Sequence, residues 1–168
     1  MRNKRLLILG WARHGKDTAA EYLRDKHGVR FASSSYFLAE KVVMPELSKR
    51  GIEYASLDDC YADRVNHRAL WRDIIAEYNG DDPARLARAI LADCDCYVGM
   101  RTAHEYAAAK PLFDHVLWVD ASARGLPPEG RDSMDIDYAP DMIRIDNSGT
   151  LEQLRGHLDD WMRAISWA

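Results

Sequence analysis

Residues 5–18 read RLLILGWARHGKDT, and this stretch decides the fold. A short apolar run ends at Gly10. Gly15 and Lys16 follow five residues later, and a helical pattern covers residues 16–26. A strand, a glycine-bracketed loop and a helix in this order are typical of a phosphate-binding P-loop. The glycines let backbone N–H groups turn toward phosphate oxygens, and the N-terminus of the helix adds its dipole. The stretch therefore predicts a site for the phosphates of a nucleotide.

The loop supplies the first candidate residues. Lys16 can reach the terminal phosphates as a point charge. A Ser or Thr normally follows this lysine and binds Mg²⁺, but here Asp17 holds that place and Thr18 comes one position later. We expect Lys16 and Asp17 to be catalytic, and Asp17 and Thr18 to ligate Mg²⁺. The expected ATP-binding residues of the loop are Gly10, Ala12, Arg13, His14, Gly15, Lys16, Asp17 and Thr18.

The bulk composition is that of an ordinary globular protein. The chain has 168 residues, of which 47% are hydrophobic and 30% charged, and this length suits a single domain. No apolar run approaches the roughly 20 residues that span a membrane. The apolar run after the basic start MRNKR is too short for a signal peptide. We therefore expect a cytoplasmic protein with no membrane partner.

Charge and cysteine content narrow the possible partners. The formal net charge of −4 argues against binding nucleic acid through the whole surface, although a local basic groove remains compatible with it. The three cysteines, Cys60, Cys94 and Cys96, cannot all pair with one another. A C-x-C without a second Cys or His pair is a weak zinc signal, so we expect reduced thiols.

Short apolar runs alternate with helical patterns along the chain. Strands are expected at residues 5–10, 29–33, 96–100, 115–120 and 141–146. Helices are expected at residues 16–26, 35–50, 57–78, 83–92, 102–110 and 151–165. This alternation predicts an α/β fold with a five-stranded, mostly parallel sheet flanked by helices.

Arg101 is the next candidate catalytic residue. It follows the expected strand at 96–100, and ligands of open α/β sheets bind at the carboxyl ends of strands. An arginine there can hold a phosphate through two hydrogen bonds. The alternative is a surface arginine paired with Glu105, one helical turn further on.

A row of arginines provides a candidate acceptor site. Arg64, Arg68 and Arg72 recur at i, i+4 and i+8, which places them on one face of the expected helix. Like charges in this spacing disfavour an isolated helix, so an anion is expected to face them. Trp71 and His67 have rings that can stack on a base. The alternative is a solvated helix face with Trp71 in the core.

Three loops add further candidates. Ser33 and Ser35 follow the second strand, where they bind an acceptor or cap the next helix. Arg124 and Arg131 lie in the loop at residues 121–138, and we expect Arg124 to bind ATP and Arg131 to be catalytic, unless both are ordinary loop charge. Asn147 follows the fifth strand and is expected to lie near adenine, or to belong to a turn that caps the last helix.

Taken together, the motifs resemble a known family. They are Gly-Lys-Asp-Thr at 15–18, Arg-x-x-x-Glu at 101–105, Leu-Trp-Val-Asp at 117–120 and Asp-Asn-Ser-Gly-Thr-Leu-Glu-Gln-Leu at 146–154. The chain resembles the P-loop nucleotide kinases of bacteriophages, in particular the deoxynucleoside monophosphate kinases and their relatives. The resemblance implies a three-layer P-loop kinase fold over residues 1–168, use of ATP and Mg²⁺, a helical acceptor-binding segment at about 34–92 and a short lid at about 121–138.

The chain departs from this family at the end of the third strand. Family members often have Asp-Val-Arg there, with the Asp near Mg²⁺, whereas this chain has Gly99-Met100-Arg101. Asp17 and Asp95 are the candidate replacements for the missing aspartate.

One branch of the family is similar in size and in its Arg-x-x-x-Arg-x-x-Trp helix. These phage enzymes phosphorylate 5-hydroxymethyluracil in DNA. A short lid leaves the acceptor side open for a polymer, the target base has to leave the stack, and the arginine row is suited to the DNA backbone. We therefore expect transfer of the γ-phosphate of ATP to the 5-hydroxymethyl group. The alternatives are a deoxynucleoside monophosphate kinase that makes dNDPs and a nucleotide-binding module without catalysis.

Overall fold

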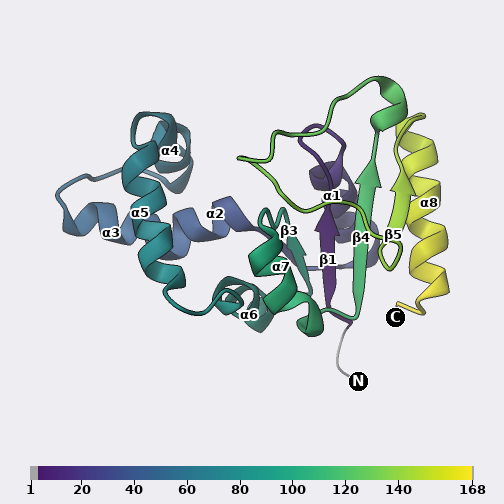
Figure 1. Ribbon diagram of the computed structural model, residues 1–168, viewed down its shortest axis with the longest axis horizontal. Helices are drawn as coiled ribbons and strands as arrows, with labels where there is room; N and C mark the ends of the chain where they lie inside the picture. Colours follow the sequence, from purple (N-terminus) through teal and green to yellow (C-terminus); the bar gives the residue numbers. More distant parts are fainter. Residues whose placement is uncertain (1–3, 168) are drawn as a thin grey trace.

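A five-stranded parallel sheet forms the centre of the computed structural model, which describes residues 4–167 (Figure 1). The strands are β1 Leu6–Leu9, β2 Phe31–Ser33, β3 Cys96–Val98, β4 His115–Asp120 and β5 Ile143–Asp146. Their order across the sheet is β2-β3-β1-β4-β5, and every neighbouring pair runs parallel. All five expected strands are confirmed, each within a few residues of its expected bounds.

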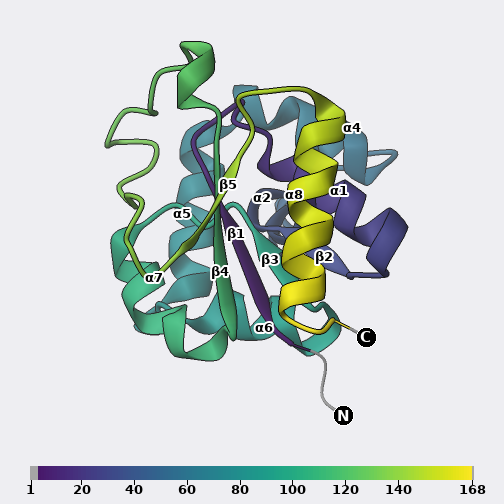
Figure 2. The same cartoon turned by 90° about the vertical axis from the view of Figure 1, so that its right-hand side faces the viewer.

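Helices cover both faces of the sheet. They are α1 Lys16–His27, α2 Ser34–Leu38, α3 Met44–Lys49, α4 Leu57–Ala62, α5 Arg68–Asn79, α6 Arg85–Asp93, α7 Ala103–Ala109 and α8 Leu151–Ala164. Helices α1 and α8 lie against one face, and α6 and α7 lie against the other (Figure 2). The three layers and the strand order are those of a P-loop kinase fold, which confirms the expected fold class.

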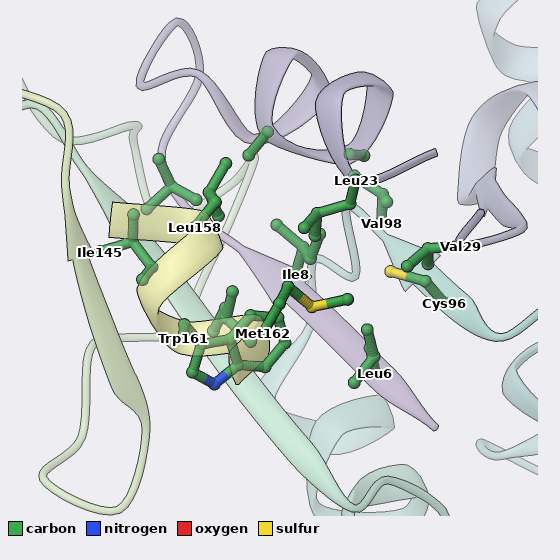
Figure 3. Close-up of a cluster of buried hydrophobic side chains, with 14 of the residues drawn as sticks. Leu6, Ile8, Leu23, Val29, Cys96, Val98, Ile145, Leu158, Trp161 and Met162 are labelled. Atoms are coloured by element: carbon green, nitrogen blue, oxygen red, sulfur yellow. The ribbon is translucent and has the colours of Figure 1, made fainter. Parts of the chain in front are cut away.

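Strand β1 divides the core between the two faces. Its four residues are all fully buried, which suits a central parallel strand. Leu6 and Ile8 point toward α1 and α8, where they meet residues such as Leu158 and Met162 (Figure 3). Leu7 and Leu9 point to the opposite core. Because side chains alternate along a strand, four consecutive apolar residues supply both layers.

Helices α3, α4 and α5 form an arm that extends beyond the β2 edge of the sheet (Figure 1). The arm has its own buried cluster of Ala39, Val43, Leu47, Cys60, Trp71 and Ile74. The expected helix at 35–50 is present in outline, but a π-helical segment, Ala39–Val43, separates α2 from α3. A π turn shifts the helical register by one residue, so an expectation based on regular periodicity cannot locate it.

The expected continuous helix at 57–78 is wrong. A 3₁₀ turn, Asp63–Asn66, follows α4, and His67 leaves helical geometry with φ −129° and ψ 28°. The Asp63 carboxylate accepts hydrogen bonds from Asn66 Nδ2 at 2.6 Å and Tyr54 Oη at 2.9 Å, and it lies 3.1 Å from His67 Nε2. Side-chain bonds of this kind compete with the helix and account for the break.

Two expectations about composition can be compared with the structure. Within residues 4–167, Cys60, Cys94 and Cys96 are all free thiols, as expected. No helix in the same range is long and apolar enough to cross a bilayer.

The half-buried carboxylate of Asp159 on α8 joins this helix to α1. Asp159 accepts hydrogen bonds from Lys26 Nζ at 2.6 Å and Tyr22 Oη at 3.0 Å, and it lies 2.8 Å from His27 Nε2. Burial alone raises the pKa of Asp159, but the bonds from Lys26, His27 and Tyr22 outweigh it and lower the pKa to about 2. A carboxylate with a depressed pKa stabilises the fold above its unfolded pKa of about 4, and this stability is lost as the pH falls toward 2.

We expect Asp159→Asn to lower the melting temperature at pH 6 by about 3–12 °C, from roughly 1.5–3 kcal/mol for bonds to a charged group. The difference from wild type should shrink between pH 4 and pH 2, as measured by thermal melts across that range. Asp160→Asn is the matched control, because that carboxylate is 71% exposed. A deficit that is independent of pH would assign the effect to packing instead of charge.

Candidate active site

The loop between β1 and α1 packs tightly on the ends of β4 and β5. Gly10 has φ +156°, and a Cβ there would stand 2.7 Å from the carbonyl oxygen of Val119. Gly15 has φ +98°, and a Cβ there would stand 2.3 Å from Asn147 Nδ2. A side chain at either position would clash, so both glycines are needed for the close turn that the P-loop motif predicts.

Two buried side chains support this loop from beneath. Asn147 Nδ2 donates to the carbonyl oxygen of His14 at 2.9 Å. His14 Nδ1 in turn accepts from the backbone N–H of Ala121 at 2.9 Å. Asn147 was expected near adenine, and the structure places its amide under the P-loop instead. His14 belongs to the loop and can offer a nucleotide only its backbone. Its buried ring joins the loop to Ala121, the first residue of the lid.

Lys16 reaches from the start of α1 to the end of β3. The side chain is 9% exposed, and a Cβ on Gly99 would lie 3.7 Å from Lys16 Cε. Burial lowers the pKa of Lys16, and Arg101 lowers it further, whereas Asp17 and Glu129 act in the opposite direction. A desolvated ammonium group interacts strongly with any anion that enters the site.

Arg101 and Lys16 line one hollow at the crevice between β1 and β3. Helix α1 follows β1 on one face of the sheet and α7 follows β3 on the other, and such a switch point is where open α/β sheets bind ligands (Figure 2). Arg101 Nη1 donates to Glu129 Oε1 at 2.6 Å. The alternative pairing with Glu105 is wrong, because Glu105 accepts instead from the hydroxyl of Tyr97 at 2.7 Å.

A hollow of about 440 Å³ opens beside the P-loop. We call it the P-loop hollow, and its polar lining includes Lys16, Asp17, Ser33, Ser34, Ser35, Arg64 and Arg101. Ser33 caps α2 by accepting from Tyr36 N at 3.4 Å, and Ser35 Oγ lies 3.1 Å from Tyr61 Oη. The structure therefore brings the expected catalytic residues Lys16, Asp17 and Arg101 together with Ser33 and Ser35. Ser34, which lies between these two serines, donates its hydroxyl to the carbonyl oxygen of Gly99 at 3.0 Å.

Two further hollows adjoin the P-loop hollow. The central hollow, about 590 Å³, shares Ser34, Ser35 and Arg101 with it and continues to Ile75 and Asn79 on α5. The arginine hollow, about 600 Å³, shares Ile75 and Asn79 with the central hollow. The three hollows therefore adjoin one another in a series that runs from the P-loop to the arginine-bearing side of α5.

The arginine row lines one of these hollows despite the broken helix. Arg64, Arg68 and Arg72 all line the arginine hollow, and Arg64 also lines the P-loop hollow. Arg64 lies in the 3₁₀ turn, with its guanidinium 3.9 Å from the centre of the Tyr61 ring. Trp71 is only 6% exposed and packs in the arm's buried cluster, so its ring is not open to stacking by a base.

The lid brings a different residue to the P-loop from those expected. Arg131 pairs with Asp137 at 2.8 Å, and Arg124 is exposed in a short 3₁₀ helix, Ser122–Arg124. Neither arginine is among the residues that line the P-loop hollow. Glu129 instead accepts a hydrogen bond from the backbone N–H of Ala12 at 2.7 Å. Sequence reasoning missed Glu129, and its place after Pro127-Pro128 in a polar loop gives no periodic signal for it.

The structure narrows the candidates for a magnesium ligand. Within residues 4–167, no group of three His, Cys, Asp or Glu side chains is placed to hold a metal ion. Asp17 lines the P-loop hollow, and Thr18 is exposed one residue further on. Asp95 as a replacement ligand is wrong, because it precedes β3 at the opposite end of the sheet and binds Arg30. An ion held by Asp17 and nucleotide phosphates would suit Mg²⁺, which binds through few carboxylates.

Comparisons with known proteins find similarity in structure only. No family model and no curated protein matches the chain. A sugar kinase from Janibacter sp. HTCC2649 is 20% identical with a TM-score of 0.45, and the match covers 99% of this chain and 94% of that one. A gluconokinase from Sinorhizobium meliloti 1021 is 12% identical with a TM-score of 0.47, and the match covers 98% and 96% respectively. Similarity at this level does not identify an acceptor for this chain.

Proposed function

We propose that the protein is an ATP-dependent kinase that transfers the γ-phosphate to a nucleotide-type acceptor. The observation that carries this proposal is that Lys16 and Arg101 line one polar hollow beside the P-loop, at the crevice between β1 and β3. Phosphoryl transfer depends mainly on positioning and on cations that stabilise charge around the moving group. Lys16 would hold the terminal phosphates, and Arg101 would approach from the acceptor side.

The loop would bind the nucleotide through its backbone N–H groups and the N-terminus of α1. Asp17 and Thr18 would hold Mg²⁺ together with the phosphates, and the ion would neutralise charge on the phosphate oxygens. Asn147 and His14 would keep the loop rigid, because their hydrogen bonds fix it to the ends of β4 and β5. A rigid cradle requires little reorganisation during the reaction.

For the acceptor, we propose the 5-hydroxymethyl group of 5-hydroxymethyluracil in DNA. The support is Arg64, which lines both the P-loop hollow and the arginine hollow, and the exposed Arg68 and Arg72 in the lining of the arginine hollow. A row of cations that ends in solvent suits a polymer with several phosphates.

The alternative acceptor is a free deoxynucleoside monophosphate. One observation favours it: the central hollow has about 590 Å³, a volume in the range of small-molecule sites. Its walls include Leu38, Ile75 and Leu86, and Glu105 and Tyr97 form a hydrogen-bonded pair in its lining. Such a pocket would take one base, and the P-loop hollow would take its single phosphate.

One assay tests these proposals together. ATP labelled at the γ-phosphate is offered with each free dNMP, with DNA containing 5-hydroxymethyluracil and with the matching thymine DNA. Label on the modified DNA alone supports the DNA kinase, and label on free nucleotides alone supports the alternative. Bound ATP with no transfer to any acceptor would instead indicate a nucleotide-binding module without catalysis.

The arginine row gives a prediction that separates the two acceptors. If DNA is bound, Arg68→Ala and Arg72→Ala should each reduce the log–log salt slope of DNA affinity by about one unit. Arg163→Ala on the far face of the molecule is the matched control and should leave the slope unchanged, because it lies on α8. The measurement is a titration with fluorescent DNA at several salt concentrations. Slopes identical to wild type in both variants would exclude backbone contacts at these positions.

A further inference from the structure

The P-loop binds a carboxylate of the same chain, that of Glu129 in the lid. The carboxylate of Glu129 accepts from the backbone N–H of Ala12 at 2.7 Å through Oε2. Its other oxygen, Oε1, accepts from Arg101 Nη1 at 2.6 Å. The side chain is only 13% exposed although it comes from a loop without regular structure.

The contacts of Glu129 are those that a phosphate oxygen would make. Backbone N–H groups of a glycine-bracketed loop form an anion-binding concavity, and arginine binds carboxylates and phosphates through the same donors. Lys16 is also within electrostatic reach, since Glu129 raises the pKa of Lys16. A loop N–H and the Arg101 guanidinium therefore hold one carboxylate, whose charge also acts on Lys16.

The lid is fixed at points on either side of Glu129. On the far side, the Asp135 backbone N–H donates to the carbonyl oxygen of Arg101 at 3.1 Å, and the Asp135 carboxylate accepts from Ala103 N at 2.5 Å. Met134 and Ile136 are buried in the core. On the near side, Ala121 is bonded to His14. Figure 1 shows the intervening loop passing over the carboxyl ends of the strands.

We propose that Glu129 is an internal plug, whose carboxylate occupies a phosphate position of the P-loop and must leave when a polyphosphate binds. The proposal rests on the proposed function, because it takes the P-loop as the site of the nucleotide phosphates. A carboxylate and a phosphate at this place repel each other and compete for the Ala12 N–H and for Arg101. The segment that carries Glu129 lies between the fixed points at Ala121 and Met134, so it can withdraw while those contacts stay. Polyphosphate binding and withdrawal of the lid are then one coupled event.

The test uses inorganic tripolyphosphate, which probes the phosphate cradle without a base or an acceptor. Its affinity is measured by calorimetry for wild type, Glu129→Gln and Glu129→Ala. We expect both variants to bind about tenfold more tightly than wild type, because a bond to a charged group is lost only from the unliganded state. Asp132→Asn is the matched control, since it removes the same charge from an exposed position three residues along the lid. Thermal melts establish that each variant is folded.

The outcomes distinguish this proposal from the proposed function. Tighter binding by both Glu129 variants, with Asp132→Asn unchanged, supports the plug. Binding equal to or weaker than wild type overturns the plug and leaves the P-loop assignment intact. Failure of wild type and both variants to bind tripolyphosphate overturns the plug and the proposed function together. A variant that binds as wild type does but loses phosphoryl transfer would place Glu129 in the reaction, which also overturns the plug.

Discussion

Lys16→Met is expected to lower the rate of phosphoryl transfer by roughly 10³-fold or more. The substitution removes a cation that would stabilise the negative charge that develops on the phosphoryl group during transfer. The same substitution should leave the melting temperature unchanged or raise it. Lys16 is 9% exposed, burial lowers its pKa, and Arg101 lowers it further. Replacing a desolvated charge by an apolar side chain of similar volume is often neutral or stabilising.

The measurement pairs turnover at saturating ATP with thermal melting of the same preparation. Lys41→Met is the control, because Lys41 lies exposed on the helical arm and shares the change in side chain. A lower turnover together with an unchanged or higher melting temperature would show that the Lys16 charge serves the reaction and does not stabilise the fold. Full turnover in a folded Lys16→Met protein would overturn the P-loop kinase proposal.

The sheet and the P-loop were predictable because their signals are local. Strand β1 consists of four consecutive apolar residues, and its burial on both faces follows from that run. Gly10 and Gly15 bracket the loop in the sequence itself, and the structure shows a close backbone approach at both. Lys16 and Arg101 were each expected beyond the carboxyl end of a strand, and the strand order that the structure shows, with β1 beside β3, brings these two ends together.

The helical arm was less predictable because side chains override periodicity there. The helix expected at 57–78 breaks where the Asp63 carboxylate bonds Asn66 and Tyr54. A pattern of apolar residues contains no signal for that competition. Arg64 therefore leaves the regular helix, yet it lines the same hollow as Arg68 and Arg72.

Contacts between distant loops could not be derived from spacing. Glu129 lies 117 positions from Ala12, and Asn147 lies 133 positions from His14. Both contacts depend on how the β4–β5 connection and the turn after β5 fold over the P-loop. The sequence suggested that positive charge in the lid would face the nucleotide, whereas the structure places a carboxylate there and pairs Arg131 with Asp137.

Arg101→Ala is expected to lower turnover at saturating ATP by roughly 10²–10³-fold, with a smaller effect on ATP affinity. An arginine on the acceptor side of the crevice should act mainly on charge that develops during transfer. Saturation kinetics check this, because a residue that acts only in the transition state changes turnover more than ground-state binding. Arg30→Ala is the control, since that arginine is bound to Asp95 at the opposite end of the sheet.

Glu129 makes the Arg101 result a sharper test than a single loss of activity. Arg101 holds Glu129, so Arg101→Ala loosens the plug, and it also removes a cation for which the polyphosphate competes. If Arg101 did nothing but hold Glu129, its removal would resemble Glu129→Gln, with tighter tripolyphosphate binding and no fall in turnover. We expect the two variants to differ in turnover, because Glu129→Gln keeps the cation that acts in the transfer step and Arg101→Ala loses it. The double variant should follow Arg101→Ala in turnover, because loss of the carboxylate cannot replace a cation at the transferring phosphate.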